Sequence, residues 1–235
     1  MHSTYHLGFF CSLLLFFFPL FAEETPYFVP PEGWQEMHPK NLTSFVQMGY
    51  VEPRRASFAP SINIAEEEVE DCSQKEYVQI VQDLYANKKS ASSRKLGAIK
   101  TKVGRADLLE VTMQKGSFTV KMLQCILVRK GKAHIMTGAC LDKEWSALRP
   151  AFVEAFRSFK VVEDLLEDLS DPSRKEKIEK TLQTLASILQ DPSFPQKAKE
   201  DKVLEFHAHL AKECKEQGSY WHYLVVQKLH TMLAG

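Results

Sequence analysis

Helical and strand patterns alternate along the chain, and the clearest helical pattern follows residue 73. Ser73 and Glu76 have the spacing of a capping box, in which each side chain satisfies a backbone N–H group at a helix start. Apolar residues then recur at i, i+3, i+4, i+7 and i+8, namely Tyr77, Ile80, Val81, Leu84 and Tyr85. This spacing predicts an amphipathic helix of about 15 residues with one apolar face.

Between residues 96 and 140 the pattern becomes that of strands separated by short turns. Turns are expected at Gly104, Gly116 and Gly131, and such short connections join antiparallel neighbours. Two further strand-like segments precede the helix. The predicted strands are Thr43–Val51, Ser61–Ala65, Leu96–Val103, Ala106–Met113, Phe118–Arg129 and Lys132–Cys140.

A second helical stripe follows the last of these strands. Its members are Trp145, Leu148, Phe152, Phe156 and Phe159. Pro150 interrupts the stripe and suggests that the regular helix begins near it, because proline is tolerated in a first turn. Ser158–Val162 can then close as a short strand. Helix, meandering strands and helix together predict an α+β fold in which helices are layered on a sheet.

The chain divides into three parts on these patterns. Residues 28–162 form the predicted sheet domain, preceded by a proline-punctuated lead over residues 23–31. Residues 163–235 are predicted to be a small all-α appendage of three helices, with starts at Asp171-Pro172 and Asp191-Pro192 and a stop at Gly218. The appendage could stand alone or pack on the sheet domain, and packing is favoured because about 73 residues would be only marginally stable alone. We also expect residues 28–162 to fold without it.

The first 22 residues read as a signal peptide. Leu7 to Ala22 is uncharged and almost wholly apolar, and as a helix it would reach roughly 24 Å, which is shorter than a bilayer core. Cleavage is expected after Ala22, so the mature protein would be exported to a periplasm, a cell envelope or the medium. No Lys or Arg precedes the apolar run, which leaves open the alternative that it is kept as a membrane anchor.

Composition narrows the class of protein further. The chain has 235 residues, of which 44% are hydrophobic and 26% charged, as in soluble globular proteins. These values exclude a disordered polymer, a fibrous repeat and a polytopic membrane protein. Thirty basic residues balance thirty acidic ones, so the net charge gives no reason to expect a nucleic-acid partner.

The cysteines do not indicate a disulfide scaffold. After removal of the signal peptide four remain: Cys72, Cys125, Cys140 and Cys214. The turn at Gly131 places Cys125 opposite Met136 on the neighbouring strand. The same register places Cys140 opposite Lys121, so the two sulfurs are roughly 13 Å apart, beyond disulfide reach. We expect free, buried thiols.

Motifs of catalysis and metal binding are missing from the sequence. It contains no nucleophile elbow, zinc-protease helix, phosphate-binding glycine loop or Cys-x-x-Cys. His207, His209, Cys214 and His222 cannot converge on one metal from one helix face, and the acidic run 66–71 lacks the spacing of a calcium loop. We therefore predict no cofactor, no metal and no enzyme activity. An enzyme of unrecognised, hydrolase-like type remains the alternative.

Charge is segregated within the strand region. Residues 88–132 contain twelve Lys and Arg residues against only Asp107 and Glu110, a local net charge of +10. Cations near two predicted turns form the candidate partner-binding face: Lys100, Lys102, Arg105, Arg129, Lys130 and Lys132. The expected partner is an acidic protein, with an anionic envelope surface as an alternative. Nucleic acid is disfavoured, because Phe118 is the only aromatic residue there. Lysines that merely keep strand edges from aggregating would look the same.

Residues 30–162 resemble the PsbP/Mog-type family. The resemblance rests on four features: Pro30-Pro31-Glu32-Gly33-Trp34, Phe58-Ala59-Pro60-Ser61-Ile62-Asn63-Ile64, Gly104-Arg105-Ala106, and Gly131 to Gly138 followed by Phe152-x-x-x-Phe156-x-Ser158-Phe159. It implies an α/β/α sandwich around an antiparallel sheet and a non-catalytic binding or assembly role. One branch of the family serves photosystem II and another binds the Ran GTPase, but nothing in this sequence identifies either partner. The sequence thus predicts an exported binding module that engages a protein through the basic face.

Overall fold

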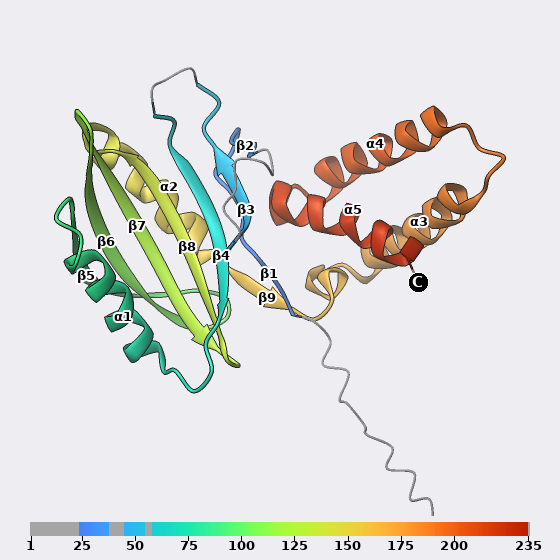
Figure 1. Ribbon diagram of the computed structural model, residues 1–235. Coiled ribbons are helices and arrows are strands. Elements are labelled where there is room, and N and C mark those ends of the chain that lie inside the picture. Colours follow the sequence, from blue (N-terminus) through green and yellow to red (C-terminus); the bar gives the residue numbers. More distant parts are fainter. Residues whose placement is uncertain (1–23, 38–44, 55–57, 235) are drawn as a thin grey trace, which may run out of the picture.

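An antiparallel sheet of seven strands forms the centre of the protein (Figure 1). The structure is a computed structural model and describes residues 24–37, 45–54 and 58–234. The strand order is β2-β3-β4-β8-β7-β6-β5. The strands are β2 (Gln35–Glu36), β3 (Val46–Val51), β4 (Ser61–Glu68), β5 (Ala91–Lys100), β6 (Arg105–Lys115), β7 (Phe118–Arg129) and β8 (Lys132–Leu141).

Helices lie on both faces of this sheet. On β7, Cys125 and Leu127 belong to one buried cluster and Ile126 to another, because neighbouring residues of a strand point to opposite faces. Helix α1 (Gln74–Ala86) covers the Ile126 face over β5 and β7, and α2 (Trp145–Arg157) covers the other face over β7 and β8. The predicted α/β/α sandwich around an antiparallel sheet is confirmed.

Local signals placed several elements correctly. The capping box at the start of α1 is present, since Ser73 and Glu76 satisfy each other's backbone N–H groups. The hairpin β7–β8 has the predicted register, with Cys125 opposite Met136 and Cys140 opposite Lys121. The four cysteines among the described residues are free, and Cys125, Cys140 and Cys214 are buried.

Three expectations about element boundaries were wrong. Strand β5 begins at Ala91 rather than Leu96, because its first residues are polar and lie on the exposed edge of the sheet, where no apolar alternation marks them. Helix α2 begins at Trp145 and contains Pro150 in its interior. The helix start expected at Asp191 is instead the end of α3, where the Asp191 carboxylate accepts a hydrogen bond from the backbone N–H of Ser193.

The N-terminal lead is part of the fold. Residues 25–27 form strand β1 (Thr25–Tyr27), which pairs with β9 (Lys160–Val162) in a separate two-stranded sheet. Tyr27 and the following Phe28 are fully buried. The interpretation of residues 23–31 as a mere lead was therefore wrong, and β9 closes on this segment instead of on the large sheet.

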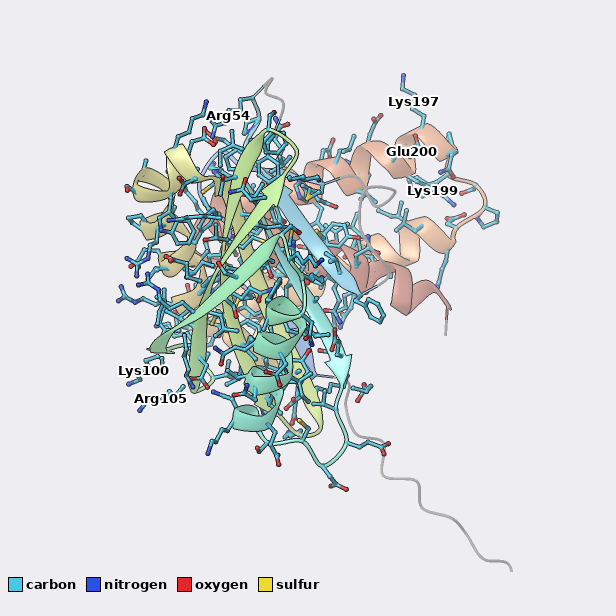
Figure 2. The ribbon with its side chains drawn as sticks, turned by 60° about the vertical axis from the view of Figure 1, so that its left-hand side comes forward. Arg54, Lys100, Arg105, Lys197, Lys199 and Glu200 are labelled. Atoms are coloured by element: carbon cyan, nitrogen blue, oxygen red, sulfur yellow. The ribbon has the colours of Figure 1, made fainter. Side chains whose placement is uncertain are left out.

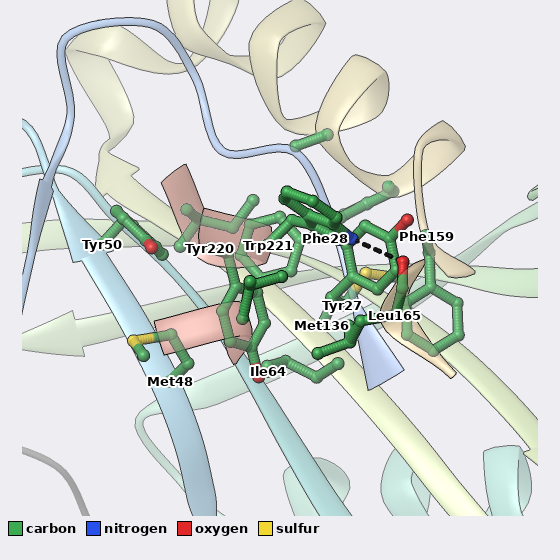
Figure 3. Close-up of a cluster of buried hydrophobic side chains, with 14 of the residues drawn as sticks. Tyr27, Phe28, Met48, Tyr50, Ile64, Met136, Phe159, Leu165, Tyr220 and Trp221 are labelled. Atoms are coloured by element: carbon green, nitrogen blue, oxygen red, sulfur yellow. Dashed lines mark hydrogen bonds between the residues drawn. The ribbon is translucent and has the colours of Figure 1, made fainter. Parts of the chain in front are cut away.

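Three helices follow β9, as predicted. They are α3 (Pro172–Gln190), α4 (Gln196–Glu213) and α5 (Gly218–Ala234), and a short 3-10 turn, Leu165–Asp168, leads into them. Helix α5 packs on the sheet side of the molecule, where the Tyr220 ring lies 5.6 Å from that of Phe28 and 6.3 Å from that of Tyr50 (Figure 3). The hydrophobic core thus runs from the sheet into the helical appendage.

A close contact between β8 and α2 explains one feature of the family resemblance. A Cβ atom added at Gly138 would lie 2.4 Å from the ring of Phe152, which is fully buried. Glycine at this position therefore lets α2 approach the sheet.

In the part of the chain that the structure describes, no helix has both the length and the apolarity of a membrane span. The predicted signal peptide, residues 1–22, lies outside the described residues.

Candidate binding surface

The turn between β5 and β6 is held rigidly by one buried side chain. Thr101, only 4% exposed, donates through its hydroxyl to the carbonyl of Gly104 at 2.8 Å and accepts from two backbone N–H groups of the turn. The backbone N–H of Lys102 donates to the carbonyl of Phe159 at 3.1 Å, just beyond α2. The turn is thereby fixed, while Lys100, Lys102 and Arg105 stay exposed. We call these three residues the cationic tip.

The cationic tip departs from the charge pattern of its own hairpin. Further along the two strands, opposite charges meet: Arg94 pairs with Glu110 at 2.9 Å, and Lys95 with Asp107 at 2.8 Å.

At the tip, however, Lys100 lies directly opposite Arg105 in the strand register. Like charges in this position destabilise a sheet. Among the described residues, neither cation has a carboxylate within ion-pair distance, and neither does Lys102.

The second predicted turn, between β7 and β8, is different because its cations are neutralised within the chain. The Glu24 carboxylate lies 3.1 Å from the guanidinium of Arg129 and 2.7 Å from the ammonium of Lys130. Lys132 pairs with Glu66 at 2.7 Å. The structure thus brings all six predicted residues to one end of the sheet. Among the described residues, those of the cationic tip form no ion pair, although Arg105 also interacts electrostatically with Asp107, the partner of Lys95.

The pKa values around the second turn reflect this pairing. The hydrogen bond from Lys130 lowers the pKa of the Glu24 carboxyl, and the bond to Glu66 raises the pKa of Lys132. His134, whose Nδ1 is 3.1 Å from Glu66, is 2% exposed, and burial lowers its pKa. The ion pair with Glu66 therefore makes Lys132 part of the folded framework.

Sequence reasoning missed both carboxylates. Glu24 lies in the segment interpreted as a lead, and Glu66 lies in the acidic run, which was expected to be a solvated turn but begins within β4. The only available signal was a long-range one, the pairing of β4 with β8 that sets Glu66 opposite His134.

A hollow adjoins the cationic tip. Its volume is about 510 Å³, and Lys100, Lys102 and Arg157 line it together with Glu154 of α2. Glu154 forms an ion pair with Arg157 at 2.6 Å, so the two lysines supply its unbalanced charge. Figure 2 shows Lys100 and Arg105 extending away from this end of the sheet, on the side opposite Lys197 and Lys199 of α4. The geometry suits an anionic group that approaches from solvent.

The residues weighed as metal ligands do not converge. His207 and His222 have ring centroids 6.3 Å apart, but Nε2 of His222 is hydrogen-bonded to the backbone carbonyl of Cys214 at 2.8 Å. Within residues 24–37, 45–54 and 58–234, no three His, Cys, Asp or Glu side chains are grouped to hold a metal ion.

Comparison with known proteins finds similarity in structure only. No protein-family model and no curated protein sequence matches the chain. Among solved structures it is similar to LpqN of Mycobacterium tuberculosis, which is involved in cell envelope biogenesis, with 17% identity and a TM-score of 0.47 over 60% of this chain and 84% of that one. It is also similar to cyanobacterial PsbP from Synechocystis sp. PCC 6803, with 15% identity and a TM-score of 0.43 over 69% and 99%.

A third similar structure is the Ran-binding protein Mog1p of Saccharomyces cerevisiae, with 17% identity and a TM-score of 0.42 over 60% of this chain and 95% of that one. The chain itself has the antiparallel sheet between helices that the PsbP/Mog resemblance implied. Likeness at these identities and TM-scores concerns the arrangement of the chain, and no function follows from it.

Proposed function

We propose that this chain is an exported, non-enzymatic binding module that engages an acidic protein through the cationic tip, Lys100, Lys102 and Arg105. The observation that carries the proposal is the pair of like charges that Lys100 and Arg105 form across the hairpin, while Arg94 and Lys95 of the same hairpin pair with Glu110 and Asp107. A carboxylate supplied by a partner would relieve the repulsion between the two cations.

The structure narrows the six-residue face predicted from the sequence to three residues. Arg129, Lys130 and Lys132 already have carboxylate partners within the chain, so a second acidic group would gain less from binding them. The cationic tip is exposed and mounted on a turn that Thr101 fixes, which limits the backbone entropy lost on binding.

The ligand class follows from the surroundings of the tip. Glu154 and Arg157 pair with each other in the hollow, so its net positive charge is limited to Lys100 and Lys102 and offers no continuous basic track to a run of phosphates. A protein surface can present separate carboxylates to Lys100 and Arg105 while leaving Glu154 uncontacted. Long-range attraction of this kind raises the association rate and is screened by salt.

Charge reversal of the tip tests the proposal. We expect the variant Lys100→Glu, Lys102→Glu, Arg105→Glu to keep its fold, since exposed substitutions seldom cost much stability, and to lose capture of the partner from the native compartment. Capture by the unaltered protein should weaken between about 0.05 and 0.5 M salt. Cross-linking followed by mass spectrometry measures both effects.

A matched control changes the net charge equally at another place. Lys177, Lys197 and Lys212 are exposed on α3 and α4, and replacing all three by Glu should leave capture unchanged. Equal loss in both variants would show a general effect of net charge. Full capture by the tip variant would contradict the proposal and would indicate that Lys100, Lys102 and Arg105 only keep the hairpin soluble.

Export is tested separately. The proposal rests on the short apolar run Leu7–Ala22. We expect N-terminal sequencing of the native protein to begin at or near Glu23, and fractionation to place the protein outside the cytosol. A native chain that begins at Met1 in the membrane fraction would instead support the retained anchor.

A further inference from the structure

A groove with apolar walls runs beside α1 on the face of the sheet that this helix covers only in part, and its floor includes the polar residues Asn63, Gln124 and Thr137. Its volume is about 310 Å³, and it lies between α1 and the first residues of β3, with β4, β7 and β8 as its floor. Figure 1 shows α1 over one side of the sheet, with β4 and β3 uncovered by a helix on that face.

The walls of the groove carry apolar side chains that the fold leaves in solvent. Phe45 is 62% exposed, Ile80 49% and Leu84 58%. These are three of the five exposed large hydrophobic side chains in the described part of the chain, and the other two, Phe194 and Leu204, lie on the helical appendage. The stripe predicted to face the core therefore extends beyond what the sheet covers, and such clustering indicates an interaction site.

The groove has an acidic end and a basic end. At one end the Glu67 carboxylate accepts a hydrogen bond from the hydroxyl of Tyr77 at 2.5 Å. At the other end the Lys88 ammonium lies 5.7 Å from the centre of the Tyr85 ring. Tyr77 and Tyr85 are eight positions apart, which corresponds to about 12 Å along α1, and Lys88 lies just beyond the C-terminal end of this helix.

We infer that this groove is the interface of a symmetric homodimer, in which the two copies of α1 lie antiparallel around a twofold axis. A twofold interface must be complementary to itself, so that each residue meets its counterpart in both directions. The twofold axis would pass midway between Ile80 and Leu84, at the level of Gln82 along the helix. This sets Ile80 of one copy against Leu84 of the other. The same rotation brings Glu67 of each copy to Lys88 of its partner.

The dimensions of the groove also fit a second copy of α1. Beyond α1 the groove crosses β8, which α1 covers in part, and then β4 and β3, and three strands at about 4.8 Å spacing are about 10 Å wide, close to the diameter of a helix with its side chains. Each α1 would cover the strip left open on the other sheet. The interface does not include the cationic tip, so the test of the dimer is independent of the test of the proposed binding function.

Sedimentation equilibrium of the full mature chain tests the inference. We expect a concentration-dependent dimer whose dissociation constant rises at least about tenfold in Leu84→Asp, because a central apolar anchor is replaced by a charge. The matched control is Leu204→Asp, at an equally apolar and 67% exposed position on α4, which should leave the dimer intact.

Charge exchange identifies the partner as a second copy. Glu67→Lys and Lys88→Glu should each weaken self-association, because each sets like charges together twice in the dimer. An equimolar mixture of the two variants should associate again. In the mixed dimer the lysine introduced at position 67 meets the glutamate introduced at position 88, and the unaltered Lys88 of one copy meets the unaltered Glu67 of the other. The double variant Glu67→Lys, Lys88→Glu should likewise recover the dimer, and near-ultraviolet circular dichroism checks that every variant is folded.

Three results would overturn the inference. If the chain is monomeric at concentrations up to about 1 mM, it forms no such dimer, because specific dimers generally form at lower concentrations. A dimer that survives Leu84→Asp uses another surface. Failure of the mixed charge variants to associate would mean that the groove serves a different protein.

Discussion

Replacing Trp221 with alanine should lower the free energy of unfolding by about 3–5 kcal/mol. Trp221 is fully buried where α5 meets the sheet side of the molecule, in the cluster that includes Tyr27 and Phe28 (Figure 3). Its indole N–H donates to the carbonyl of Leu165 at 3.0 Å. Alanine would leave a large cavity and a buried carbonyl without its donor, and both effects are unfavourable.

Urea unfolding followed by far-ultraviolet circular dichroism measures this loss. Trp221→Phe is the informative companion, because it keeps most of the volume and removes the hydrogen bond, and we expect it to cost less than Trp221→Ala. A loss below about 1 kcal/mol for alanine, smaller than any usual buried aromatic deletion, would contradict the packing seen here. The packing would also be contradicted by two separate unfolding transitions, if Trp221→Ala changed the urea midpoint only of the transition that belongs to the helical appendage.

Elements were predictable from the sequence where the interactions that form them are local. The bounds of β7 and the register of the β7–β8 hairpin follow from the tight turn at Gly131, because a two-residue turn fixes which residues face each other. The start of α1 follows from the capping box formed by Ser73 and Glu76, three positions apart.

Elements that depend on distant partners could not be predicted. Strand β1 contains Pro26 and is only three residues long, and it exists because β9, more than a hundred positions away, pairs with it. Ile80 and Leu84 have the spacing of core residues, but whether a helix face is buried depends on how much of the sheet lies beneath it.

The candidate site shows the same division. Counting residues located the basic region correctly, since charge is a property of composition. Counting could not separate Lys132, which Glu66 neutralises from another strand, from Lys100, which has no such partner among the described residues. The uncompensated cations emerged only once β4 and the segment containing Glu24 were placed beside the β7–β8 turn.

The sheet domain should fold without the helical appendage, but with lower stability. In a chain ending at Val162, the half of the core beneath α2 stays complete, including the fully buried Phe152 and Phe156. Phe28 and Tyr50, however, lose the cover of Tyr220. We therefore expect a folded but weakened domain, with a free energy of unfolding lower by about 5 kcal/mol, since two or three large apolar side chains are uncovered at about 1.5–3 kcal/mol each.

The fragment should start at residue 24 instead of at the predicted boundary of 28, so that β1 and the Glu24 ion pairs are kept. Its circular dichroism should retain the signal of the antiparallel sheet, its urea midpoint should fall, and it should bind more of a hydrophobic dye than the full chain does. Full-length Trp221→Ala is the matched comparison, because it loosens the same contact without removing the helices. An insoluble or unfolded fragment would show that the appendage completes a single core, since the sheet then cannot tolerate exposure of Phe28 and Tyr50 to water.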